Sequence, residues 1–333
     1  MIDINEVITG LHERYITRNG FVFTSLTYPF NVYNAIVIKY PYDVPCFSPL
    51  VEGSRRSLKE QIDFINEYEI EKAVIIADNI DFIIHCKSLK YLKIIPADTV
   101  GNNFDYSPLY KMTSLKCVYA STTYGYKQEL STQIDYSKIN GLEDIGVTYK
   151  GHINYENIKT LKSLGISGCK KNDLTDVFKS PVLDTLSVIQ CGFKSLEGIQ
   201  QSKKLQCLYL YYNRSLKDIS VLSKVKDTLK ALRIENCPKI EDFSVLGELE
   251  NLELLELVGS NKLPNLDFLK SMKNLKTFVF DMNVLDGDLT PCLNLSYVYS
   301  DRNRKHYNLK DSDLPKGEYV RGNEDIEEWR RLE

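Results

Sequence analysis

Side chains that could bind a ligand or catalyse a reaction gather in neighbouring leucine-rich segments of the chain. One of these segments, residues 205–213, reads LQCLYLYYN, with three tyrosines among three leucines. In this segment and the next two, the side chains that could bind or catalyse are those of Tyr209, Tyr211, Tyr212, Arg233, Glu235 and Glu256. Tyrosine and arginine are enriched at binding hot spots, since they offer a large contact area with a polar group at its end. Two carboxylates can also serve a glycosidase, and tyrosines can stack on sugar rings. These residue types therefore favour either a protein-binding or a sugar-directed surface.

Other catalytic motifs are absent from the sequence, which contains no GxGxxG, GxxxxGK[ST], HExxH or GxSxG pattern. His85 and Cys86 are adjacent, but neighbours in an extended strand point to opposite faces, so we do not expect a Cys–His dyad. None of the eight cysteines forms a CxxC pair, so no zinc site is predicted. The sequence therefore predicts a protein without catalytic activity, cofactor or metal.

The tyrosine-rich segment belongs to a series of repeats with the pattern L-x-x-L-x-L-x-x-N/C. Six units begin at residues 161, 183, 205, 229, 252 and 275, so they are spaced 22, 22, 24, 23 and 23 residues apart. Weaker units begin at residues 70, 89, 115, 142 and 295. The pattern predicts about eleven units over residues 67–303. One unit cannot bury its apolar face alone, so the units must stack into a continuous core.

The second half of each unit has apolar residues at every third position, for example Leu216, Ile219 and Leu222. This spacing suits a 3₁₀-type or extended segment better than an α-helix. Such compact units resemble the repeats of bacterial internalin-like leucine-rich-repeat proteins, over about seven-tenths of the chain. The resemblance implies an α/β solenoid: a curved horseshoe with a parallel sheet on the concave side and 3₁₀ or extended segments on the convex side.

The asparagine or cysteine that follows each strand lies where the chain turns, and its side chain can bond backbone groups that would otherwise be orphaned. We expect this ladder role for Asn213, Asn283, Asn303, Cys169, Cys191 and Cys237. Metal or redox chemistry is the alternative for the three cysteines. Eight cysteines in a long chain without a signal peptide are typical of free thiols in a reducing compartment.

Side chains alternate along a strand, so positions three, five and seven of a unit should face outward on the concave side. Tyr209 and Tyr211 are then displayed, with Tyr212 at the strand edge. Strands lie about 4.8 Å apart, which predicts one contiguous row of Tyr209, Arg233 and Glu256. The alternative is that the tyrosines pack on one another along the sheet without any partner.

Two flanking regions do not repeat. Residues 1–66 are predicted to form a small α+β cap, and residues 304–333 a polar C-terminal cap or tail. Within the first, Arg18-Asn19-Gly20-Phe21 predicts a hairpin turn, FVFTSLTY and NAIVIKYPY predict strands, and SRRSLKEQIDFINEYE predicts a helix. Short helices are also predicted around residues 4–11 and after Asn323. A separate binding domain is the alternative for residues 1–66.

A basic cluster at residues 302–306 could contact phosphate, but a solvated surface is the simpler interpretation. The formal net charge is −3, which argues against a general nucleic-acid binder. No apolar run reaches the length of a membrane span, and the first residues lack the pattern of a signal peptide. We therefore expect a cytoplasmic protein with no nucleic-acid or membrane partner.

The functional prediction is a non-catalytic scaffold that captures a protein or peptide on its concave face. An immunity-type or antitoxin-like role would be one example, by analogy alone. The alternative is a carbohydrate-binding or glycan-processing protein that uses the tyrosine and glutamate patch. A shallow sheet removes little water from carboxylates, so it shifts their pKa values little. A catalytic carboxylate pair is therefore less favoured than a surface that only binds a partner. The predicted partner-binding residues are Tyr209, Tyr211, Tyr212, Arg233, Glu235, Glu256, Tyr297 and Tyr299.

Overall fold

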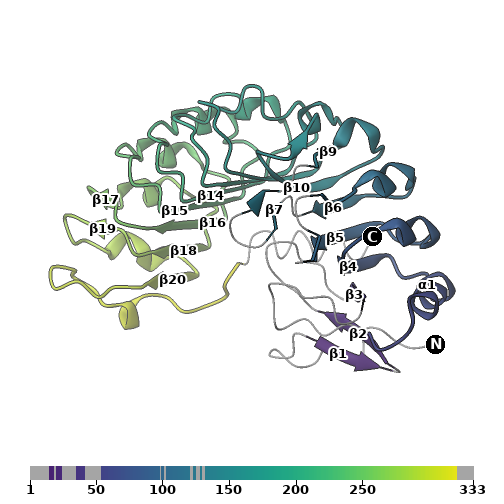
Figure 1. Ribbon diagram of the computed structural model, residues 1–333. Helices are drawn as coiled ribbons and strands as arrows, with labels where there is room; N and C mark the ends of the chain where they lie inside the picture. Colours follow the sequence, from purple (N-terminus) through teal and green to yellow (C-terminus); the bar gives the residue numbers. More distant parts are fainter. Residues whose placement is uncertain are drawn as a thin grey trace. The chain divides into compact units, whose positions relative to one another are not determined.

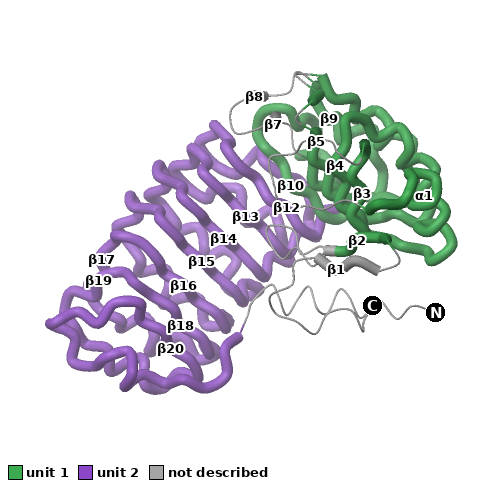
Figure 2. The backbone as a smooth tube through the Cα atoms, turned by 60° about the horizontal axis from the view of Figure 1, so that its bottom comes forward, with its two compact units in different colours: residues 1–158 green, residues 159–333 purple. Residues whose placement is uncertain are grey.

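The chain forms two compact units, residues 1–158 and residues 159–333 (Figure 2). The computed structural model describes residues 15–18, 20–24, 35–41, 54–97, 99–100, 103–120, 123–124, 128–129 and 132–320. The helices predicted at residues 4–11 and after Asn323 lie outside these ranges. In the part of the chain that is described, no helix is both long and apolar enough to cross a bilayer.

In its described part, unit 1 is built on seven strands of a sheet in the order β1-β2-β3-β4-β5-β6-β10. The first three strands pair antiparallel, and the strands from β3 onward pair parallel. The bounds are β1 Tyr15–Arg18, β2 Phe21–Thr24, β3 Ala35–Tyr40, β4 Lys72–Ala77, β5 Tyr91–Pro96, β6 Cys117–Ala120 and β10 Asp144–Thr148. Two small pairs accompany this sheet, β7 Thr123–Tyr124 with β8 Gln128–Glu129, and β9 Ile134–Asp135 with β11 His152–Ile153.

Among the described residues, the connections of unit 1 contain one α-helix, α1 (Leu58–Glu67), and four 3₁₀ helices. The 3₁₀ helices are η2 Asp81–His85, η3 Ser107–Lys111, η4 Tyr136–Lys138 and η5 Tyr155–Asn157. A capping box starts α1, in which Ser57 accepts from the Glu60 N–H and the Glu60 carboxylate accepts from the Ser57 N–H. The predicted hairpin at residues 18–21 is confirmed, because Arg18 pairs directly with Phe21.

The predicted helix at SRRSLKEQIDFINEYE is confirmed as α1, whereas the extended conformation assumed for His85 is wrong. Helix α1 buries Gln61 and Ile65, whereas Leu58 and Ile62 are only partly buried. Gln61 is kept inside by a hydrogen bond from its side-chain amide to a backbone carbonyl at 2.9 Å. His85 ends the 3₁₀ helix η2 rather than lying in a strand, since a tight turn there carries the chain from β4 toward β5.

Unit 1 also encloses a histidine. The Tyr136 hydroxyl lies 3.0 Å from His152 Nδ1, and both side chains are buried. Burial lowers the pKa of His152 to about 4, because the charged imidazolium would lose its hydration. His152 is therefore neutral in the folded chain near pH 7.

Unit 2 is a leucine-rich-repeat solenoid whose seven strands form one parallel sheet. The bounds are β12 Ser163–Ser167, β13 Thr185–Ile189, β14 Cys207–Tyr211, β15 Ala231–Glu235, β16 Leu254–Val258, β18 Thr277–Phe280 and β20 Tyr297–Ser300. A small parallel pair, β17 Lys262–Leu263 with β19 Asn283–Val284, lies beside it. The 3₁₀ helices are η6 Ile199–Gln201, η7 Ser220–Lys224, η8 Ser244–Glu248, η9 Asp267–Lys270, η10 Thr290–Asn294 and η11 Asp311–Asp313. In Figure 1 the strands of this unit line the inner side of its coil, and the 3₁₀ helices form the outer side.

The predicted repeat pattern is confirmed in both units. Each of the eleven predicted segments contains one strand, and every strand begins two residues after the first residue of its segment. The inward positions of β14, Leu208 and Leu210, are fully buried and pair in register with the inward leucine and isoleucine of β15. The predicted 3₁₀ segments also follow the strands, so the leucine-rich-repeat fold class is established.

The ladder role predicted after the strands of unit 2 is confirmed for Asn213, Cys191 and Cys237. It is wrong for Asn283, because the buried Oδ1 of that side chain has no hydrogen-bond partner. Asn213 is fully buried, donates to the Val188 carbonyl at 2.9 Å and accepts from the Cys191 N–H at 2.9 Å. Burial raises the pKa of the Cys191 thiol to about 12, so this thiol stays protonated and inert. Asn303, by contrast, is exposed and only accepts from the N–H of Asp311, because the repeat series ends there.

Candidate partner-binding surface

The outward positions of the unit 2 strands form continuous rows across the sheet. The register pairs Tyr209 with Arg233, Arg233 with Glu256, Glu256 with Val279 and Val279 with Tyr299. The predicted row of Tyr209, Arg233 and Glu256 is therefore confirmed. In parallel rows, Tyr211 pairs with Glu235 and Thr277 pairs with Tyr297. The sheet thus brings seven of the eight predicted residues onto one face, and the eighth, Tyr212, directly follows β14.

An ion pair lies at the centre of this face. Arg233 Nη2 donates to Glu256 Oε1 at 2.7 Å, and Arg233 Nε also contacts the other carboxylate oxygen. The Glu256 side chain is 8% exposed and that of Arg233 is 31% exposed. Burial alone would lower the pKa of the Arg233 guanidinium, but the hydrogen bond and the charge of Glu256 outweigh it and raise the pKa. Arg233 is therefore charged, and its contacts with Glu256 fix both side chains in position.

The tyrosines hold the arginine from two sides. Arg233 Nη1 donates to the Tyr211 hydroxyl at 3.0 Å, and the guanidinium lies 5.7 Å from the centroid of the Tyr209 ring. Cation–π contacts of this kind strengthen as the arginine loses water. The ring centroids of Tyr209 and Tyr211 are 6.4 Å apart. The face therefore presents a preorganised aromatic and cationic cluster rather than freely rotating side chains.

Tyr209 is buried rather than displayed, and that part of the prediction is wrong. It faces outward in the strand, yet only 8% of it is exposed, because it packs in an apolar cluster with Cys207, Ala231 and Leu254. Tyr211 lies against the same cluster and is partly exposed. Tyr209 is therefore buried mainly by apolar side chains of neighbouring strands, and its ring contact with a tyrosine is with Tyr211 of the same strand.

Sequence reasoning missed two residues on this face, Tyr319 and Val320. The Tyr319 hydroxyl donates to Glu256 Oε1 at 2.8 Å, although the two residues are 63 positions apart. Val320 packs against the apolar cluster around Tyr209. The stretch that contains them, KGEYVRG, is short and polar and lacks the repeat pattern, so no sequence signal pointed to it.

Tyr212 stands at the edge of the face in a conformation that is unusual for its type. It has a φ of +57° and is 42% exposed. The same repeat position also has positive φ at Gly168, Gln190, Asn236 and Gly259. A tyrosine in the left-handed region costs about 1 kcal/mol or more. The repeat geometry therefore imposes this conformation, and it projects a large aromatic ring beyond the strand.

The remaining predicted residues flank the centre. Glu235 is partly exposed, and Tyr299 is 40% exposed. The Lys316 ammonium lies 5.7 Å from the ring centroid of Tyr297 and 5.5 Å from that of Tyr299. The face thus carries basic as well as acidic groups beside its tyrosines.

The geometry offers little for acid–base chemistry. Glu256 is held by Arg233 and Tyr319, so it does not form a free carboxylate pair with Glu235. Among the described residues, no group of three or more histidine, cysteine, aspartate or glutamate side chains is arranged to hold a metal ion.

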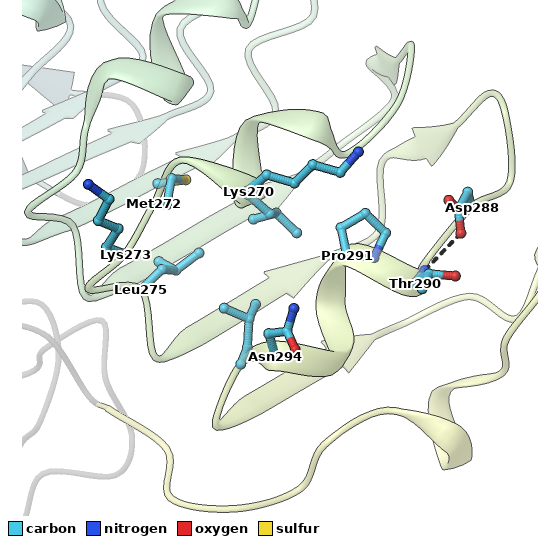
Figure 3. Close-up of a pocket in the computed structure, with 10 residues that line it drawn as sticks. Lys270, Met272, Lys273, Leu275, Asp288, Thr290, Pro291 and Asn294 are labelled. Carbon is cyan, nitrogen blue, oxygen red and sulfur yellow. Dashed lines mark hydrogen bonds between the residues drawn. The ribbon is translucent and has the colours of Figure 1, made fainter.

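A hollow of about 440 Å³ lies on the other side of unit 2, between η9 and η10 (Figure 3). Its carboxylate, that of Asp288, caps η10 by accepting from the Thr290 N–H.

No protein-family model matches the chain, and no curated protein matches its sequence. Among solved structures, an internalin (InlF) of Listeria monocytogenes is similar over 79% of this chain and 71% of that chain, with 14% identity and a TM-score of 0.43. A plant peptide hormone receptor, RGFR1 in complex with RGF2, is similar over 69% of this chain and 43% of that chain, with 15% identity and a TM-score of 0.37. A leucine-rich-repeat protein of Leptospira interrogans covers 74% of this chain and 82% of its own length, with 12% identity and a TM-score of 0.32. Structures similar to this chain thus include bacterial leucine-rich-repeat proteins, internalins among them.

Proposed function

We propose that this chain is a non-catalytic binding protein that captures a protein or peptide on the concave face of unit 2. The single observation that carries the proposal is the fixed cluster of Tyr211, Arg233 and Glu256 on the sheet of unit 2. Hot spots at protein interfaces are rich in tyrosine and arginine, and they bind better when their side chains are already ordered. The exposed rings of Tyr212 and Tyr299 extend the contact area on both sides.

The sugar-directed alternative is less well supported. Its catalytic form needs two available carboxylates, and Glu256 is committed to Arg233 and Tyr319. Its binding form needs flat, accessible rings, and Tyr209 is buried. A glycan-array measurement tests the binding form directly, because a protein binder should give no saturable sugar signal.

The experiment for the main proposal is capture of partners from native cell extract, followed by mass spectrometry. A Tyr211→Ala/Tyr212→Ala/Tyr299→Ala variant removes three rings of the face and keeps both members of the Arg233–Glu256 pair, although Arg233 loses its hydrogen bond to the Tyr211 hydroxyl. A matched control, Leu293→Ala, removes an exposed apolar side chain from η10 on the other side of the unit. We expect a protein that the wild type and the control retain and the triple variant loses. A partner retained equally by all three would refute the proposed face.

Finer statements remain predictions from sequence. An immunity-type role would require the captured partner to be a toxin that loses activity in the complex. The cytoplasmic location, the absence of nucleic-acid and membrane partners, and the cap boundaries at residues 66 and 304 are proposed on the sequence grounds given above.

A further inference from the structure

The segment Pro315–Val320 returns to the sheet of unit 2 after the last repeat. The Val298 N–H donates to the Pro315 carbonyl at 2.9 Å, and the Gly317 N–H donates to the Ser296 carbonyl at 2.9 Å. The segment therefore lies antiparallel to β20 along the outer edge of that strand. A Cβ on Gly317 would lie 2.8 Å from the Ser296 carbonyl oxygen, so this close approach requires glycine. In Figure 1 the segment turns from β20 back toward β18 and β16.

Beyond Gly317 the chain leaves the edge and contacts the concave face. The Tyr319 ring meets the Tyr297 ring edge-on at 5.2 Å, and its hydroxyl donates to Glu256. The Val320 N–H donates to Thr277 Oγ1 at 2.9 Å. Two consecutive residues of the segment thus contact β20, β18 and β16.

The Val320 side chain completes this arrangement on an apolar seat. The seat is formed by Cys207, Tyr209, Ala231 and Leu254, which lie in adjacent strands. The contacts combine a hydrogen bond to a buried charge, a backbone hydrogen bond, an aromatic edge and an apolar seat. An extended peptide ligand is recognised in this way, through main-chain bonds for affinity and side-chain sites for specificity.

We propose that Pro315–Val320 is an intramolecular ligand of the concave face, and that the partner binds there as an extended segment with a tyrosine followed by an aliphatic residue. The partner's tyrosine then replaces Tyr319 at Glu256, and its aliphatic side chain replaces Val320 on the apolar seat. This inference rests on the proposed function, since it names the partner's chemistry at the same face. It adds that the face is closed until the chain's own segment is displaced.

Displacement has a measurable consequence. The apparent dissociation constant of a competing peptide equals its intrinsic constant divided by the fraction of molecules whose face is open. The bond between the Tyr319 hydroxyl and the Glu256 carboxylate is a hydrogen bond to a charged group, whose loss changes an equilibrium by about tenfold or more. Weakening the segment's hold should therefore tighten binding of a peptide in trans by about tenfold.

The test uses the full chain and a fluorescein-labelled peptide of sequence LPKGEYV, which copies residues 314–320. Its affinity is measured by fluorescence anisotropy for the wild type, for Tyr319→Ala/Val320→Ala, and for the control Leu293→Ala. We expect binding to the double variant to be at least about tenfold tighter than to the wild type and the control. A peptide with alanine in place of the tyrosine should lose this affinity. Equal affinity for all three proteins, or no binding to the double variant, would overturn the inference.

Two further measurements keep the test decisive. Hydrogen exchange of the β14, β16 and β18 amides shows whether the double variant is folded. If it is not, Tyr319→Phe removes only the hydroxyl and should still tighten peptide binding. A natural partner that the wild type and Tyr319→Ala bind equally, and that Tyr211→Ala loses, would leave the proposed function standing and refute the intramolecular ligand.

Discussion

Breaking the central ion pair should destabilise unit 2, and removing both partners should restore most of the loss. Arg233→Met removes the guanidinium but keeps a long apolar stem. The Glu256 carboxylate, 8% exposed, then keeps only the Tyr319 hydroxyl as a partner among the contacts described above. Glu256→Leu in the same background removes the stranded charge and fills a similar volume.

The magnitude follows from the burial of the two groups. Leaving one partner of a fully buried pair without the other costs about 3–5 kcal/mol. Here the Arg233 side chain is 31% exposed, so water screens the pair and can reach the stranded carboxylate. We therefore expect Arg233→Met to lower the free energy of unfolding by about 2 kcal/mol. The Arg233→Met/Glu256→Leu variant should lie within about 1 kcal/mol of the wild type, because well-packed apolar residues replace such pairs without penalty.

The assay is equilibrium urea unfolding of the wild type, both single variants and the double variant. These four proteins form a double-mutant cycle, which should give a coupling energy of about 2 kcal/mol between Arg233 and Glu256. The exposed pair Lys270–Asp267, with an N–O distance of 2.6 Å, is a matched control. The double-mutant cycle of this control pair should give a coupling energy of about 0.5 kcal/mol or less, because both side chains are more than half exposed. Additive losses at Arg233 and Glu256 would refute the reasoning, since they would show that the two charges are not coupled.

A change of pH and two substitutions test how three other residues contribute to the stability of the fold. Unfolding free energy should fall by about 2 kcal/mol between about pH 7 and pH 5 through His152, whose pKa is lowered to about 4 in the folded chain. Its stabilisation is complete above the unfolded pKa of about 6.5 and is lost as the pH falls toward 4, so His152→Gln should flatten the pH profile of urea midpoints. Tyr212→Gly should raise stability by up to about 1 kcal/mol, because it relieves a left-handed tyrosine; a loss measured by thermal unfolding would contradict this. Asn213→Ala should cost about 2–4 kcal/mol in urea unfolding, because the Cys191 N–H and the Val188 carbonyl lose their partner. If Asn213→Ala lowered the free energy of unfolding no more than the same substitution at an exposed asparagine, the ladder role of Asn213 would be contradicted.

The strands could be predicted from sequence because each one repeats a local requirement. Leu205, Leu208 and Leu210 occupy the inward positions of their unit, and the neighbouring units repeat this choice at nearly constant spacing. Since adjacent parallel strands must align these leucines, the register of Tyr209 with Arg233 followed from the same pattern. Local periodicity therefore determined the direction of each side chain.

Exposure could not be predicted in the same way, because it depends on what covers the sheet. Tyr209 points outward as expected, yet neighbours from β15 and β16 and a distant valine bury it. The partner of Glu256 at Tyr319 comes from a polar stretch outside the repeats. A contact between segments so far apart leaves no periodic trace in a single sequence. His85 was misplaced for a related reason, since a short connection chose a 3₁₀ turn that its apolar composition did not distinguish from a strand.

The return of Pro315–Gly317 along β20 also bears on whether further strands can add to this end of the sheet. A stack of parallel strands ends in a row of unpaired N–H and C=O groups, which can template a second chain and start a fibre. Here the Val298 N–H and the Ser296 carbonyl are already engaged by the segment's own backbone. Pro315 has no N–H to offer to an incoming strand. The same short segment that reaches the concave face therefore also closes this end of the sheet against growth by addition of further strands.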